Sequence, residues 1–242
     1  MRIVVISATS VIARACVQTW AGSGNHDFVL VGRSSEKLEA TKTDLELRFP
    51  ESRFKTQLLD FASAESISKV VTEISQNPVD VVLVAQGSLT NQALVAGDLA
   101  YLQSELQLNA VSVAVVTEAF AQVLERQGFG TLGVIGSVAG DRGRAYNYSY
   151  GASKALIETY TQGLQQRFGS SSVSVCLIKP GPTESPMTAG HRGRMADPRL
   201  VAKVIVAGLK AKRRVIYAPR SWAIIMFVVR AIPFVIFKKL KF

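Results

Sequence analysis

Cysteine and histidine are scarce in this chain of 242 residues, which contains two of each. Cys16 and Cys176 lie far apart in the sequence, which excludes a disulfide scaffold and a four-cysteine zinc site. His26 and His191 are too few for a multi-histidine metal centre. We therefore expect the function of this protein to use no metal ion.

Acidic residues are absent from the last 45 positions. Eleven of the 28 basic residues follow Asp197, whereas none of the 18 acidic residues does. The net charge of +10 therefore belongs to this end of the chain, and the rest is almost neutral. The basic residues alternate with aliphatic and aromatic residues rather than with polar ones, which argues against nucleic acid as a partner.

The basic end of the chain also lacks an apolar run long enough to cross a bilayer, which takes about 20 residues. Its two longest runs, 222–229 and 231–237, are separated by Arg230, and Pro233 interrupts the second. We predict an interfacial segment, with Trp222 and the phenylalanines at headgroup level and the terminal lysines on anionic phosphates. The alternative is a helix packed on the core or on a second subunit.

Short aliphatic runs alternate with helical stretches along the rest of the chain. The runs at 3–6, 28–31, 54–59, 79–85, 131–136, 173–178 and 215–217 are typical of buried strands. Helices are expected over 11–21, 36–49, 64–75, 99–127, 150–168 and 197–210. This order predicts an α/β fold, with a single Rossmann-type, doubly wound parallel sheet flanked by helices over 1–218 and a basic apolar helical tail over 219–242. The first six residues resemble a strand and not a signal peptide.

A sheet of this kind binds its ligand at the carboxyl ends of the strands. The polar residues that follow the predicted strands should therefore meet at one edge. They are Ser7 to Ser10, Arg33, Asp60, the segment 85–87 and Ser137.

One tyrosine of six, Tyr150, is followed by a lysine four residues later, Lys154. Residues at this spacing share one face of a helix. An ammonium group near a phenol lowers the phenol pKa from its usual value of about 10, which suits a general acid or base. Ser137 precedes Tyr150 by thirteen residues at the same edge. Asn109 lies within a predicted helix, either solvated or holding a water or a backbone group at a helix break.

These motifs resemble the short-chain dehydrogenase/reductase family. The resemblance covers residues 1–218 and rests on Tyr150-x-x-x-Lys154, Ser137, Asn109, Asp60 and Pro180-Gly181. It implies that Tyr150 exchanges a proton with the substrate oxygen, that Ser137 hydrogen-bonds this oxygen, and that hydride passes between nicotinamide and the substrate carbon. It also implies that Lys154 lowers the pKa of Tyr150 and binds the nicotinamide ribose, and that Asn109 anchors a water of a proton relay. The cofactor-binding positions implied are Ser7, Thr9, Ser10, Ile12, Arg33, Asp60, Ala85, Gln86, Gly87, Lys154, Pro180, Gly181 and Thr183.

The chain departs from the family in its first loop, where three glycines are replaced by Ser7, Val11 and Ala13. Val11 is β-branched and disfavours positive φ, so phosphate binding would depend on a helix N-terminus and on serine and threonine hydroxyls. The Asn-Asn-Ala-Gly pattern is also changed, to Val-Ala-Gln-Gly over 84–87. A non-catalytic nucleotide-binding protein is therefore an alternative.

Cofactor choice depends on the end of the second strand. A carboxylate there would bind the ribose 2′-hydroxyl and repel a 2′-phosphate. This chain has Arg33 and Ser34 instead, which can donate hydrogen bonds to phosphate. We therefore predict NADP(H) as the cofactor.

A further resemblance is to one branch of the family, the bacterial decaprenylphosphoryl-2-keto-erythro-pentose reductases. It rests on 127–130, 137–142, 215–219 and the tail. It implies reduction of a polyprenyl-phosphate-linked ketosugar by a cytoplasmic protein that is peripheral at the inner face of the cell membrane. His191, Arg192 and Arg194 would suit an anionic substrate group or form a basic surface loop. The alternative is a soluble reductase of small or acyl carbonyls that uses the tail for oligomerisation, and a homo-oligomer is expected.

Overall fold

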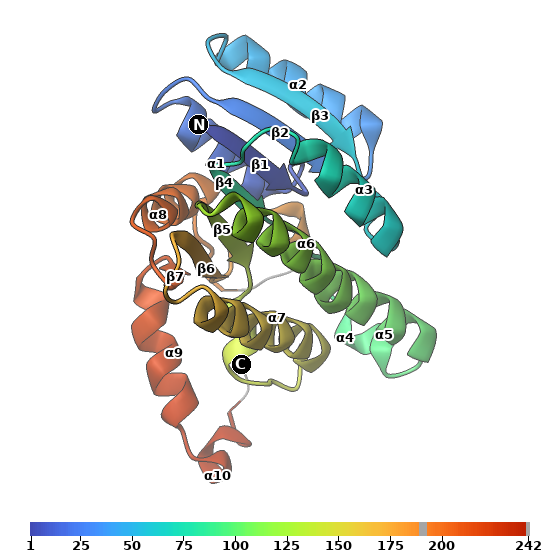
Figure 1. Cartoon of the computed structure of the whole chain (residues 1–242). Helices are drawn as coiled ribbons and strands as arrows, with labels where there is room; N and C mark the ends of the chain where they lie inside the picture. Colours follow the sequence, from blue (N-terminus) through green and yellow to red (C-terminus); the bar gives the residue numbers. More distant parts are fainter. Residues whose placement is uncertain (189–192, 241–242) are drawn as a thin grey trace.

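The computed structural model describes residues 1–188 and 193–240. Its centre is one seven-stranded parallel sheet in the order β3-β2-β1-β4-β5-β6-β7 (Figure 1). The strands are β1 (Arg2–Ile6), β2 (Asp27–Gly32), β3 (Arg53–Leu58), β4 (Val81–Val84), β5 (Gly130–Ile135), β6 (Val173–Pro180) and β7 (Val215–Ala218). The predicted doubly wound parallel sheet is confirmed, with strand ends that differ from the expected ones by one or two residues at most places.

Helices cover both faces of this sheet. The α-helices of the described residues are α1 (Val11–Ala21), α2 (Ser35–Arg48), α3 (Ala64–Ile74), α4 (Gln92–Val95), α5 (Leu99–Leu106), α6 (Ser112–Gln127), α7 (Tyr148–Arg167), α8 (Pro198–Lys210), α9 (Ser221–Ala231) and α10 (Phe234–Phe237). Strand β1 alternates between two cores, because successive side chains point to opposite faces. Val4 and Ile6 pack with side chains of α3, α6 and α7, whereas Ile3 and Val5 pack with those of α1, α2 and α8.

The stretch 99–127 is helical throughout, as predicted, but it is not one continuous α-helix. A π-helical turn, η1 (Gln107–Val111), separates α5 from α6 and contains the fully buried Asn109. The whole stretch is long and apolar enough to cross a membrane, but half of its most apolar window is buried inside the fold. Its composition is therefore explained by packing against the sheet.

The tail forms α9 and α10 beyond the β7 edge of the sheet (Figure 1). Met226 is the buried side chain of α9, and none is buried in α10. Seven other large apolar side chains of these two helices are exposed: Ile224, Ile225, Phe227, Val228, Phe234, Val235 and Ile236. We call these seven residues the apolar tail face. It lies outside the core of its own chain, so core packing does not account for it.

Candidate active site

The segments that follow β1, β4, β5 and β6 converge at the carboxyl edge of the sheet. The amide of Ala85, after β4, donates to the carbonyl of Ile6 at the end of β1, at 3.1 Å. The amide of Gly136, after β5, donates to the carbonyl of Ile178 in β6, at 2.7 Å. The expected site residues at this edge therefore come from neighbouring strands.

Ser137 and Tyr150 lie side by side because a short 3₁₀ turn packs closely against the N-terminal part of α7 (Tyr148–Arg167). Ser137 caps the 3₁₀ turn η2 (Val138–Asp141), where its Oγ accepts from the Ala139 amide at 3.1 Å. This turn lies directly against α7, and a Cβ on Gly140 would come within 2.9 Å of the α7 backbone. A Cβ on Gly151 of α7 would likewise lie 2.9 Å from the Ala139 carbonyl oxygen. The two glycines thus let the serine turn approach the first turn of α7, where Tyr150 lies.

Lys154 is buried one helical turn beyond Tyr150, with 2% of its surface exposed. Its Nζ lies 5.7 Å from the centre of the Tyr150 ring and donates to the carbonyl oxygen of Ile135 at 3.2 Å. Burial lowers the pKa of Lys154 to about 8, because a charged ammonium is poorly solvated there. The lysine therefore changes its charge slightly above neutral pH.

The expected decrease in the pKa of Tyr150 is wrong for the structure described. Burial raises the pKa of the phenol, and the hydrogen bond with the Ser137 side chain offsets this only in part. Desolvation penalises the phenolate more than the neighbouring hydroxyl stabilises it. Tyr150 is therefore a protonated phenol near neutral pH, suited to donate a proton rather than to accept one.

Asn109 holds backbone at a helix break, so the expectation of a solvated side chain is excluded. Its Oδ1 accepts from the Ser88 amide at 2.7 Å, and its Nδ2 donates to Glu105 Oε2 at 3.2 Å. A Cβ on Gly87 would lie 3.2 Å from both Asn109 Oδ1 and Lys154 Nζ. Gly87 thus lies against both side chains, and it brings the asparagine and the lysine to the same short segment after β4.

Gln86, at the altered position of the fourth-strand motif, supports the π turn. Its Nε2 donates to the Leu108 carbonyl oxygen at 3.2 Å and to Ser112 Oγ at 2.5 Å. A π turn changes the pairing of its carbonyl groups, and buried carbonyls need donors. The side chain expected to bind cofactor is therefore turned toward the helix that carries Asn109.

The first loop does not need positive φ at Val11, so the predicted conflict at this position is wrong. Val11 is the first residue of α1, and the left-handed conformation lies at Ser7, with φ of 57°. Ser10 caps α1, and its Oγ accepts from the Ala13 amide at 3.3 Å. Thr9 and Ile12 are half-buried beside it. The amides at the start of α1 keep the geometry with which a helix N-terminus binds an anion.

The other predicted cofactor positions lie along the same edge. Arg33 is exposed directly after β2, whereas Ser34 accepts from the Lys37 amide as the cap of α2. Asp60 is exposed after β3 and accepts from the Ala62 amide at 2.9 Å. Pro180 ends β6, and Thr183 donates its hydroxyl to the Gly181 carbonyl oxygen at 3.0 Å. Of the loop residues expected to meet an anionic substrate group, Arg194 is exposed, and His191 and Arg192 lie outside the described residues.

Sequence reasoning missed a buried ion cluster beneath this site. Lys179 of β6 is 2% exposed, donates to Asp141, and donates to Glu158 of α7 at 2.7 Å. The Tyr217 hydroxyl donates to the other Asp141 oxygen at 3.2 Å. Burial lowers the pKa of Lys179, and the two carboxylates outweigh this effect, so that the net shift is upward. A lysine at the end of an apolar strand was the available signal, but its partners come from distant segments.

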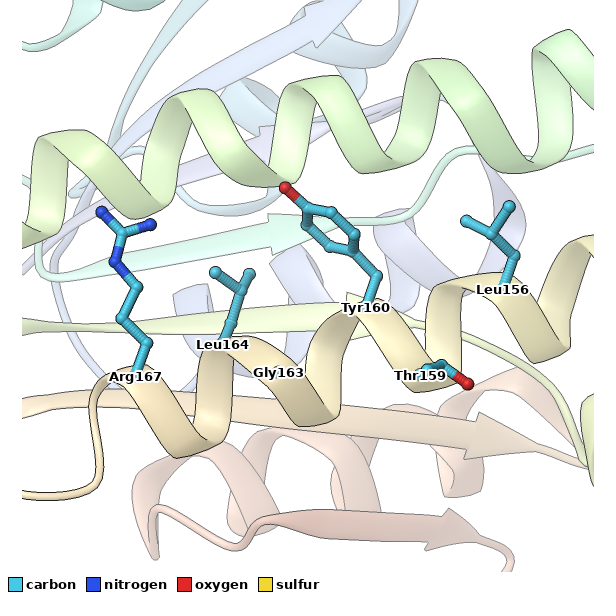
Figure 2. Close-up of a pocket in the computed structure, with 6 residues that line it drawn as sticks. All are labelled: Leu156, Thr159, Tyr160, Gly163, Leu164 and Arg167. Carbon is cyan, nitrogen blue, oxygen red and sulfur yellow. The ribbon is translucent and has the colours of Figure 1, made fainter.

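A separate apolar groove of about 530 Å³ lies on α7, away from these residues (Figure 2). It is lined by Leu156, Thr159, Tyr160, Gly163, Leu164 and Arg167. Tyr160 and Arg167 bind Glu118 of α6 at 2.7 Å and 2.9 Å and thereby join the two helices. The groove therefore belongs to an outer helical face and not to the candidate active site.

Solved structures share this architecture, and curated relatives resemble the chain in sequence. A short-chain dehydrogenase from Sphingobium yanoikuyae, solved in complex with NADPH, matches with a TM-score of 0.82 at 19% identity, covering 100% of this chain and 97% of that one. An uncharacterized oxidoreductase of Streptomyces coelicolor is 30% identical over 248 residues, or 98% of this chain and 95% of the relative. An uncharacterized oxidoreductase of Mycobacterium tuberculosis is 27% identical over 214 residues, 86% of this chain and 84% of its own.

A family model matches most of the chain. The model for short chain dehydrogenases matches residues 1–195, which include the first loop, the Asn109 turn, Ser137, and the Tyr150 and Lys154 pair. The matched region ends within the loop that precedes α8, so the basic tail lies outside it. The protein thus belongs to the short-chain dehydrogenase family of oxidoreductases.

Proposed function

We propose that this protein reduces a ketone to a secondary alcohol with NADP(H). The observation that carries the proposal is the Tyr150 phenol beside the Ser137 hydroxyl, with the buried Lys154 ammonium 5.7 Å from the phenol ring centre. Ser137 donates a hydrogen bond to the carbonyl oxygen of the substrate, and Tyr150 donates the proton that turns this oxygen into a hydroxyl. The dinucleotide supplies the hydride when bound.

Lys154 and Asn109 support this proton donor. An ammonium close to the ring stabilises the phenolate that remains after proton transfer, and it also offers donors to ribose hydroxyls. Asn109 faces the same Gly87 backbone as Lys154, so these two residues form the inner end of a path that returns a proton to Tyr150. In this proposal Asn109 keeps its role as the anchor of a relay water.

The residues along the rim fit a phosphorylated dinucleotide. The start of α1 provides amides for a pyrophosphate, and Gly87 leaves open the space that a Cβ would fill beside Lys154. Arg33 is exposed directly after β2 and has no ion-pair partner among the described residues, which leaves its guanidinium available for the proposed contact with a 2′-phosphate. The NADPH complex of the Sphingobium yanoikuyae protein supports this assignment. Asp60, Ala85, Gln86, Pro180, Gly181 and Thr183 complete the proposed cofactor rim.

The proposed substrate class is a ketone carried on a lipid, and the proposed place of action is an anionic membrane surface. The support is the apolar tail face together with the basic residues of the same segment, Arg220, Arg230, Lys238 and Lys239. The resemblance of this segment to the decaprenylphosphoryl-2-keto-erythro-pentose reductases makes a polyprenyl-phosphate-linked ketosugar the first substrate to test. The alternative is a soluble reductase of small or acyl carbonyls that forms a homo-oligomer. In that case a second copy of this chain would cover the apolar tail face.

We expect Tyr150→Phe to lower ketone reduction by about 10²–10⁴-fold, because the variant lacks the proton donor. NADPH binding should stay within twofold of wild type, since the ring remains in place. The measurement is NADPH oxidation with a panel of water-soluble and prenyl-phosphate ketones, and cofactor fluorescence for binding. Tyr146→Phe, at an exposed tyrosine four residues earlier, is the control. Full activity of Tyr150→Phe would contradict the proposal that Tyr150 donates the proton.

The pH dependence of kcat/KM for NADPH should follow the protonation of Lys154. Its pKa of about 8 means that the ammonium is present below this pH and lost above it. We expect kcat/KM for NADPH, which reports the free enzyme, to fall about tenfold per pH unit above pH 8. In Lys154→Arg the side chain stays charged, so the decline should disappear from this range. An unchanged profile in Lys154→Arg would assign the decline to another group.

Arg33→Ala tests the choice of cofactor. We expect KM for NADPH to rise about tenfold or more, because a charge-assisted hydrogen bond contributes about 1.5–3 kcal/mol. KM for NADH should stay within twofold, since NADH has no 2′-phosphate. Lys37→Ala removes another exposed cation, from the first turn of α2, and is the matched control. Parallel increases for both cofactors would contradict a phosphate contact at Arg33.

Flotation with vesicles tests the membrane surface. Phe227 and Phe234 are 69% and 72% exposed on the apolar tail face. We expect Phe227→Ser with Phe234→Ser to release the protein from vesicles that contain anionic lipid, because apolar insertion is lost while the charge is kept. Phe129→Ser, at an exposed phenylalanine outside the tail, should float like wild type. The proposal of a membrane surface is contradicted if the wild-type protein does not bind the vesicles. If it also sediments as an oligomer and the double variant does not, the apolar tail face serves self-association.

A further inference from the structure

Arg142 joins the catalytic serine turn to the tail. It follows η2 directly, five residues after Ser137. Its Nη1 donates to the carbonyl oxygens of Val229 at 2.5 Å, Ile232 at 2.6 Å and Arg230 at 3.3 Å. The last carbonyls of a helix have no partner within the helix. One guanidinium from the active-site side therefore caps the end of α9.

Both tail helices are held by the same segment. The Arg142 guanidinium carbon lies 3.7 Å from the centre of the Phe237 ring of α10, in a cation–π arrangement. Arg144 Nη2 lies 3.5 Å from the sulfur of Met226, the buried side chain of α9. The apolar tail face is not used in these contacts. The segment 142–144 thus fixes the tail through its inner side and leaves its outer side exposed.

The other side of the serine turn is fixed to the sheet. Asp141, next to Arg142, accepts from Lys179 of β6 and from the Tyr217 hydroxyl of β7. At the start of the tail, Trp222 packs on the backbone of Gly181, where an added Cβ would lie 2.0 Å from the indole nitrogen. The expectation that Trp222 belongs to the membrane-facing side chains is therefore not supported by its position. The tail contacts two segments of the candidate site, after β5 and after β6.

We propose that Arg142 is a positioning residue that makes the tail a structural part of the catalytic rim. It acts through Ser137: with α9 capped, the turn 137–141 is held between the tail and the buried ion cluster, and the serine hydroxyl keeps its place beside Tyr150. This inference rests on the proposed function for the role of Ser137 only. It predicts that loosening the tail slows turnover even in the absence of any membrane.

The test is a double-mutant cycle in lipid-free buffer, with cyclohexanone, a monoketone that does not modify arginine, as the water-soluble probe. Arg142→Ala should lower kcat about tenfold while KM for NADPH stays within twofold. In a Ser137→Ala background the same substitution should lower kcat less than twofold, because the group through which it acts is already absent. Arg213→Ala removes an exposed arginine near β7 and should leave kcat unchanged in both backgrounds. Equal losses from Arg142→Ala in the two backgrounds would overturn the proposal.

Amide hydrogen exchange gives a readout that needs neither substrate nor lipid. Amides of residues 138–142 should exchange about tenfold faster in Arg142→Ala than in wild type and Arg213→Ala, and unchanged exchange would overturn the proposal. Arg142→Lys keeps the charge and places three N–H donors on one nitrogen, so its exchange should lie closer to that of wild type than that of Arg142→Ala does. If wild type reduces no ketone of the panel, the proposed function fails, whereas the exchange experiment still decides whether Arg142 holds the turn.

Discussion

The interaction on which the site depends is the ion cluster around Lys179. One buried ammonium binds Asp141 at the end of the serine turn and Glu158 on α7, while Lys179 itself precedes Pro180 and Gly181. The Lys179 ammonium thereby links three elements that carry candidate catalytic or cofactor positions, namely η2, α7 and β6. Removing one partner of a buried ion pair costs about 3–5 kcal/mol, because the remaining charge is left without solvent or counterion. The cluster is therefore a strong constraint on how η2, α7 and β6 are arranged.

Close backbone contact is the second constraint, and it explains small residues that no local rule demands. Gly140 and Gly151 bring the serine turn against α7, and Gly87 brings the chain after β4 against Asn109 and Lys154. Side chains at these places would separate the groups whose short distances define the site. The π turn has the same effect on Asn109, because it directs a buried amide toward Ser88 while Gln86 satisfies the Leu108 carbonyl. The glycines are thus as necessary to the geometry of the candidate site as its polar side chains are, because they allow the backbone segments to approach closely.

The sequence was sufficient for the sheet and for the Tyr150 and Lys154 pair, because both depend on local periodicity. Aliphatic strands and capped helices follow from spacing alone. A helix break at Asn109 was one of two alternatives that the sequence left open, but its π form was not foreseen. The ion cluster and the higher pKa of Tyr150 could not be predicted, since each arises from contacts between distant segments. Lys179 and Asp141 are 38 positions apart, and no spacing rule links them. Val11 shows the reverse case: a family motif demanded a glycine, whereas the fold needs only a helical residue there.

The tail differs from the rest of the chain because one part of its surface makes specific contacts with the fold and another part is apolar and exposed. Its inner side has specific polar and aromatic contacts, from Arg142 to three α9 carbonyls and to Phe237, and from Trp222 to Gly181. The seven large apolar side chains of the apolar tail face are exposed, and monomeric proteins seldom leave so much apolar surface in water. A bilayer or a second subunit can cover this outer side without displacing the inner contacts. The position of the tail relative to Ser137 is therefore set by the chain itself, and whatever covers the apolar tail face meets a candidate site that is already assembled.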